Sequence, residues 1–175
     1  DFASTISINA AAAYDVGNNN ITISNIGASQ TVNLGSNLDL DSGTVVMTLA
    51  DATGSSDSLS ITTDGKNATA TATYEGITAS NIETVSVDLA STATANTTVA
   101  GGALAFADAT SVTLTGSKIT SATVTAKDGA TVDATGVTGA TTLQFDNAAK
   151  DYTVKGSSTA ATTFTMGTKL DDGDT

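Results

Sequence analysis

Cysteine, histidine, proline, tryptophan and arginine are all absent from this chain of 175 residues, and aromatic residues make up only 4% of it. Without cysteine there is no disulfide framework, thiol nucleophile or thiolate metal site. Without histidine there is no Ser-His-Asp triad and no imidazole metal site. Most enzyme mechanisms lose their usual base in such a chain, so we expect the protein not to be an enzyme.

Basic residues are also scarce. Six lysines stand against eighteen acidic residues, which gives a formal net charge of -12. Binding of nucleic acid needs lysine and arginine to displace counterions from phosphates, and an anionic membrane surface attracts the same residues. No apolar run of about 18 residues exists that could span a bilayer. We therefore expect no nucleic-acid partner and no membrane insertion.

Small and β-branched residues fill the chain instead, with 35 threonines, 29 alanines, 18 serines and 16 glycines. Threonine and valine suit a pleated strand and resist the helix. This composition predicts an almost all-β protein with a thin core of small side chains. The length suits one domain, and the chain opens Asp-Phe-Ala without methionine. We expect residues 1–175 to be a single β-rich domain or a segment of a larger surface protein.

Short alternating runs recur along the whole chain and predict strands with one apolar face. Examples are Ile6-Ser7-Ile8, Ile21-Thr22-Ile23, Val32-Asn33-Leu34, Leu38-Asp39-Leu40, Leu59-Ser60-Ile61, Val85-Ser86-Val87, Val112-Thr113-Leu114, Leu143-Gln144-Phe145 and Phe164-Thr165-Met166. Tight hairpin signals are missing between them, which favours an irregular right-handed parallel β-helix. A β-sandwich remains the alternative fold, because the intervals from Val85 to Val112, to Leu143 and to Phe164 are uneven.

Sixteen of the eighteen acidic residues are aspartates. Short carboxylates cap turns, and they also supply the hard oxygen ligands that Ca²⁺ prefers. Asp39 and Asp41 flank Leu40, so in a strand both carboxylates face one side about 7 Å apart. They repel each other unless a cation lies between them. This pair is therefore a candidate calcium site.

Two further aspartate clusters are candidate ligand sets. Asp171, Asp172 and Asp174 surround Gly173, which allows the sharp turn of a calcium loop, although a solvated acidic terminus explains the same residues. Asp146 lies in a looser cluster with Asn147 and Asp151, which serves as an Asx turn or as a ligand set. Paired carboxylates also occur in glycosidases, but the aromatic and arginine residues that usually line a sugar site are missing here.

Threonine triplets suggest a different function for the surface. Thr71-Ala72-Thr73, Thr92-Ala93-Thr94 and Thr113-Leu114-Thr115 recur at equal intervals, and Thr123-Val124-Thr125 and Thr163-Phe164-Thr165 follow outside that register. A flat threonine array on a β-helix can order water, as in some ice-binding proteins. In a chain that is one-fifth threonine such triplets arise readily, so composition explains them better.

One stretch of about forty residues carries a more specific pattern. It contains an Asp-Ser-Leu-Ser-Ile strand that begins at Asp57, a polar turn, a threonine and alanine strand, and then Ile82-Glu83-Thr84-Val85-Ser86-Val87. This stretch resembles the recurring unit of surface-layer proteins of Gram-negative bacteria and of related type I-secreted proteins. Asp57 matches the strand-leading aspartate of that unit, and Glu83 matches its glutamate. The tandem glycine-rich nonapeptides of RTX calcium rolls are missing, and only residues 171–174 resemble one.

The resemblance implies a calcium-stabilised β-helical segment of an extracellular protein that forms a two-dimensional lattice on the bacterial cell surface. The metal would be Ca²⁺, with Asp57 among its ligands, and the partners would be copies of the same chain. Contact with a cell-surface glycan would use regions outside this chain. The alternative is a binding module of a type I-secreted adhesin that recognises a glycan or a host protein.

Overall fold

The computed structural model describes residues 5–8, 14–15, 20–34, 38–39, 43–63, 76–89, 102–117, 119, 121–145 and 150–166. These residues form strands, turns and bends, with no helix among them. Sheet 1 contains β1 (Thr5–Ile8), β4 (Gln30–Leu34), β7 (Ser58–Thr63), β9 (Thr84–Leu89), β11 (Ser111–Gly116), β13 (Ala130–Val137) and β15 (Tyr152–Lys155), in that order. Sheet 2 contains β16 (Thr162–Met166), β14 (Thr141–Phe145), β12 (Ser121–Thr125), β10 (Gly102–Ala105), β8 (Gly76–Ser80), β6 (Thr44–Leu49) and β3 (Ile21–Ile26). A small third sheet pairs β2 (Tyr14–Asp15) with β5 (Leu38–Asp39).

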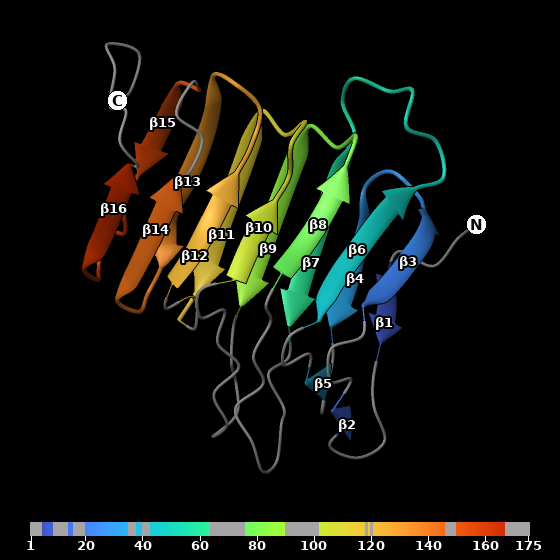
Figure 1. Ribbon diagram of the computed structural model, residues 1–175, viewed down its shortest axis with the longest axis horizontal. Helices are drawn as coiled ribbons and strands as arrows, with labels where there is room; N and C mark the ends of the chain where they lie inside the picture. Colours follow the sequence, from blue (N-terminus) through green and yellow to red (C-terminus); the bar gives the residue numbers. More distant parts are fainter. Residues whose placement is uncertain are drawn as a thin grey trace.

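Apart from β2 and β5, the chain alternates between a strand of sheet 1 and a strand of sheet 2 for seven turns. Each strand stacks in parallel on the strand of the preceding turn, as in the β7–β9 and β6–β8 pairs. Figure 1 shows the two layers running side by side from the blue end to the red end. The predicted all-β parallel β-helix is therefore confirmed, and the β-sandwich alternative does not fit, because antiparallel hairpins are missing from the described strands.

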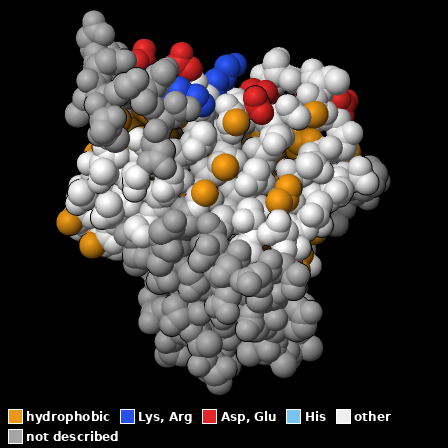
Figure 2. Space-filling model, in the orientation of Figure 1, with side chains coloured by type: hydrophobic (Ala, Val, Ile, Leu, Met, Phe, Trp, Pro, Cys, Tyr) orange, Lys and Arg blue, Asp and Glu red, His pale blue; other side chains and the backbone are white. Residues whose placement is uncertain are grey.

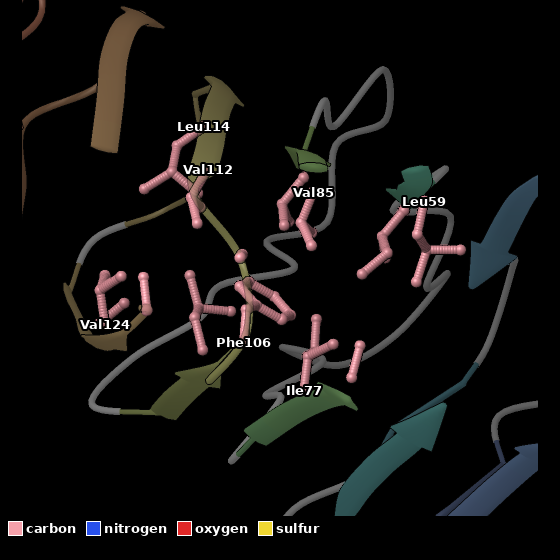
Figure 3. Close-up of a cluster of buried hydrophobic side chains, with 14 of the residues drawn as sticks. Leu59, Ile77, Val85, Phe106, Val112, Leu114 and Val124 are labelled. Carbon is pink, nitrogen blue, oxygen red and sulfur yellow. The ribbon is translucent and has the colours of Figure 1, made fainter. Parts of the chain in front are cut away.

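Alternation within each strand separates the core from the surface. In β4, Val32 and Leu34 are buried, whereas Thr31 and Asn33 lie on the outer side. Inward residues of successive turns stack in register, so that Ile61 pairs with Val87 and Val87 with Leu114. Figure 3 shows such side chains from both sheets pointing toward one another around Phe106. Parallel stacking thus fills a thin core between the two sheets.

The solenoid is irregular, as predicted, but the uneven intervals between the apolar triplets are not the lengths of its turns. Val112 pairs with Val132 in sheet 1, and Leu143 pairs with Phe164 in sheet 2. The interval from Val112 to Leu143 therefore joins two different sheets. Within sheet 1 the turns still differ in length, because the step from Thr84 to its partner Ser111 is longer than the step from Ser111 to its partner Thr131.

The first and last turns expose part of the core. The partly buried apolar residues include Ile6, Ile8 and Ile21 at one end and Val154, Phe164 and Met166 at the other. Between the ends, the inward residues of the central turns are almost fully buried. The described part of the chain contains no helix long and apolar enough to cross a membrane.

Candidate functional site

Charged side chains gather where the chain passes from sheet 2 back to sheet 1. We call this edge the rim, and it comprises the connections 27–29, 50–57, 81–83, 106–110 and 126–129 together with residues 150–151 before β15. Figure 2 shows red and blue side chains along this upper edge of the molecule. The described charged residues of the rim are Asp51, Asp57, Glu83, Asp108, Lys127, Asp128, Lys150 and Asp151.

Asp57 and Glu83 lie on adjacent turns of the rim, each directly before a strand of sheet 1. The backbone N–H of Asp57 donates to Glu83 Oε2 at 2.8 Å. The Asp57 carbonyl oxygen accepts hydrogen bonds from the backbone N–H groups of Glu83 and Thr84, at 3.1 and 3.0 Å. Backbone hydrogen bonds between the two acidic residues thus join adjacent turns. The Glu83 carboxylate also accepts a hydrogen bond from the Asp57 N–H, which the strand ladder leaves without a partner.

The Asp57 carboxylate has the most unusual surroundings of the rim. Asp57 is half-buried, and its Oδ2 atom is enclosed without a hydrogen-bond donor among the described residues. A Cβ atom placed on Gly54 would lie 2.5 Å from that oxygen, so the carboxylate packs directly against the glycine. An enclosed, unpaired carboxylate oxygen costs free energy until a donor or a cation reaches it.

Other rim carboxylates bind the backbone of a neighbouring turn. Asp108 Oδ2 accepts a hydrogen bond of 2.8 Å from the N–H of Asn81, whose φ of 58° lies in the left-handed region. Asp128 Oδ1 accepts one of 2.9 Å from the N–H of Asp151. Aspartates of the rim therefore act as caps between turns, which is the structural use of turn carboxylates that the sequence allowed.

Two aspartates bind a threonine two residues further along the chain. Asp51 Oδ1 accepts the side-chain and backbone hydrogen bonds of Thr53, at 2.6 and 3.0 Å, and these bonds lower the pKa of Asp51. Asp133 in β13 makes the same two bonds with Thr135. These bonds, led by the Thr135 hydroxyl, and then the nearby Lys155 ammonium lower the pKa of Asp133. These hydrogen bonds therefore favour the ionised form of both carboxylates.

Most of the predicted calcium ligands lie outside the described residues, namely Asp41, Asp146, Asp171, Asp172 and Asp174. The backbone of Asp39 pairs with Asp15 through β5 and β2, and its side chain is outside the described part. Within the described residues no group of three or more acidic side chains is arranged to hold a metal. The structure thus brings Asp57 together with Glu83. In the sequence, Glu83 stood out only because it matches the glutamate of the surface-layer unit.

The threonine triplets fall on both outer faces. Thr113 and Thr115 lie on sheet 1, Thr123 and Thr125 on sheet 2, and the triplets at 71–73 and 92–94 are outside the described residues. One outer row of sheet 2 runs Thr44, Gly76, Ala103, Thr123, Gln144, Thr165. Glycine, alanine and glutamine interrupt this row, so it is no regular array of hydroxyl groups.

Comparisons of the chain with protein-family models, with curated proteins and with solved structures gave no significant match. Any function must therefore be argued from the geometry of the solenoid, its rim and its outer faces.

Proposed function

We propose that this chain is a structural, calcium-stabilised segment of an extracellular bacterial surface layer, which assembles with copies of itself. The observation that carries the proposal is the seven-turn parallel solenoid, in which every described strand hydrogen-bonds to the strand of a neighbouring turn. Such a ladder gives an extended scaffold with two broad outer faces. The resemblance of the stretch around Asp57 and Glu83 to surface-layer proteins supports the same role.

Calcium would bind at the rim in this proposal. Asp57 Oδ2 is enclosed and has no donor among the described residues, and a hard cation would relieve that deficit. The Glu83 carboxylate, one turn away, uses one oxygen to accept the Asp57 N–H and keeps its second oxygen for a metal. A net charge of -12 opposes compaction, and bound cations would reduce this repulsion.

Melting curves in EGTA and in millimolar Ca²⁺ test the calcium part. At about 100 times its dissociation constant, a ligand adds about 2.7 kcal/mol of stability at one site. For a chain of this length that corresponds to a rise in Tm of about 5–10 °C. We expect Ca²⁺ to restore the Tm after EGTA better than Mg²⁺ does. Identical curves in EGTA and Ca²⁺ would contradict calcium binding.

Two matched variants locate the site. Asp57→Asn removes the charge of the enclosed carboxylate, and we expect it to lose the calcium-dependent rise in Tm. Asp51→Asn is the control, because Asp51 lies in the same connection and already accepts two hydrogen bonds from Thr53. We expect this control to keep the rise. Loss of the rise in both variants, or in neither, would place the ion elsewhere.

Electron microscopy of pure protein tests the assembly part. We expect ordered sheets in Ca²⁺ and their loss in EGTA. A protein that stays monomeric in Ca²⁺ at every concentration would instead favour the adhesin alternative, in which the module binds a glycan or a host protein.

A further inference from the structure

The outer face of sheet 2 carries no charge. Its seven strands contain no aspartate, glutamate or lysine. The outward side chains are mostly threonine and serine, with Val46, Ala103 and Ala105 among them. In Figure 2 this face is turned toward the viewer, and it is white with scattered orange.

The other described surfaces are charged. Asp88, Asp133 and Lys155 lie on the outer face of sheet 1, Asp15 and Asp39 pair in the small third sheet, and the other described charged residues lie on the rim. Two copies that each carry a net charge of -12 repel each other where their acidic surfaces meet. Among the described surfaces, the outer face of sheet 2 is therefore the one through which copies approach with the least repulsion.

The rim itself is not uniform along the solenoid. The connections before β11 carry Asp51, Asp57, Glu83 and Asp108 without a lysine. Lys127 and Lys150 both lie in the rim after β12, together with Asp128 and Asp151. The described rim is therefore net acidic toward the first turns, whereas toward the last turns its two lysines balance two aspartates.

We infer that the outer face of sheet 2 is the contact surface between copies, packed face to face with the two solenoid axes antiparallel. A two-fold axis along the strand direction keeps both rims on the same side and reverses the order of the turns. The lysine-bearing rim of each copy then lies along the acidic rim of the other. This inference rests on the proposed assembly of the chain with itself and names the surface that assembly uses.

The area of the face sets the strength of the contact. Strands of about five residues at about 3.3 Å per residue, stacked about 4.8 Å apart over seven turns, cover about 550 Å². A stable pair buries about 800 Å² on each partner. One such contact is thus weak and reversible, which suits an array in which each copy makes several contacts.

Charged substitutions on the two faces test the assignment. Thr123 in β12 and Thr113 in β11 are both partly exposed on central strands, on sheet 2 and sheet 1 respectively. Sedimentation velocity over a concentration series in Ca²⁺ measures self-association. We expect Thr123→Glu to weaken association about tenfold or more and Thr113→Glu to match the wild type. Thr142→Glu, on the exposed outer side of β14, repeats the test if Thr123→Glu fails to fold.

Lysine reversals test the antiparallel arrangement. Lys127→Glu changes the rim, whereas Lys155→Glu makes the same change on the outer face of sheet 1, where Lys155 is 53% exposed. We expect Lys127→Glu to weaken association several-fold, Lys155→Glu to leave it unchanged, and added salt to weaken the wild type. Equal effects of the two reversals would overturn the antiparallel arrangement.

The outcomes separate this inference from the proposed function. Self-association that Thr113→Glu weakens and Thr123→Glu spares would overturn the assignment to sheet 2 and leave the lattice role standing. Self-association that neither variant weakens would do the same. A wild-type chain that stays monomeric would overturn both.

Discussion

The first four turns and the last three turns build the same solenoid in different ways. In sheet 2, the step from Val45 to its partner Ile77 uses more of the chain than the step from Leu104 to its partner Val124. The strands themselves have similar lengths in both halves. Most of the difference lies in the connection from sheet 1 to sheet 2, which takes residues 64–75 in the first of these steps and only 117–120 in the second.

The core changes together with the spacing. The first turns are filled by isoleucine, leucine, valine and methionine, whereas most of the buried alanines and all the buried aromatic rings of the described residues lie from Phe106 onward. Phe145 lies 5.2 Å from Tyr152 and 6.3 Å from Phe164 between ring centroids. Large rings beside small alanines keep the packing dense where turns are short. The last three turns therefore stack on their neighbours without the long connections and the uniform aliphatic packing of the first four.

Removal of the Phe106 ring, at the boundary between the two halves, should have the largest effect on the free energy of unfolding. Phe106 is fully buried in the connection from β10 to β11, between the two halves. Phe106→Ala should cost about 3–5 kcal/mol of the free energy of unfolding. Because each turn contacts only its neighbours, a weakened boundary should also uncouple the halves. We expect two transitions in urea unfolding followed by circular dichroism.

Phe164→Ala is the control, because Phe164 lies in the last described strand and is only partly buried. This change should cost less and leave one transition. A single transition in Phe106→Ala, shifted no further than in the control, would show that the two halves unfold as one unit.

The next largest effect on the free energy of unfolding should come from Gly139, which lies in a tightly packed connection of the last turns. A Cβ on Gly139 would lie 2.3 Å from the carbonyl oxygen of Ser117 in the preceding turn, whereas a Cβ on Gly136 would lie 2.8 Å from the Thr115 side chain. Backbone cannot move aside as a side chain can. We expect Gly139→Ala to cost about 1–3 kcal/mol and Gly136→Ala clearly less, by urea unfolding. The reverse order would contradict the close approach of the two connections.

Sequence patterns predicted nine strands, each from two large apolar residues on either side of one polar residue. All nine alternating apolar triplets fall in strands, with Leu40 outside the described part. The patterns missed β2, β6, β10 and β15 as well as β8, β12 and β13, and the inward positions of these last three strands include Ala79, Ala122, Ala130 and Ala134. Alanine barely distinguishes an inner from an outer face, so the alternation is invisible in these strands. The missing strands also explain why the interval from Val112 to Leu143 mixed two sheets.

The rim was harder to predict than the strands. Asp57 and Glu83 lie far apart in the sequence, and their contact depends on the register that pairs Ser58 with Thr84. Register follows from packing of the whole turn, which no local motif contains. The resemblance marked both residues, but their contact and the enclosed Asp57 oxygen needed the three-dimensional structure.

The smallest predicted effect on the free energy of unfolding comes from an aspartate that binds a threonine two residues later, a motif that occurs in both halves. Asp51 and Asp133 each bind a threonine two residues later, but Asp133 also forms an ion pair of 3.3 Å with Lys155 in the next turn. Because the fold lowers the pKa of Asp133, its ionised form stabilises the folded state above the unfolded pKa of about 3.9. This contribution is lost as the pH falls through the folded pKa.

Asp133→Asn removes that charge and keeps an acceptor for Thr135. At pH 7 it should lower the free energy of unfolding by about 0.2–1 kcal/mol, the range of exposed ion pairs, and urea unfolding should show this gap closing below about pH 4. Lys155→Gln is the matched control, and it should show a smaller loss at pH 7, because the Thr135 bonds to Asp133 remain. If the gap between Asp133→Asn and the wild type stays constant from pH 7 to pH 3, the charge of Asp133 does not stabilise the last turns. Their stability would then come from the packing of rings against alanines alone.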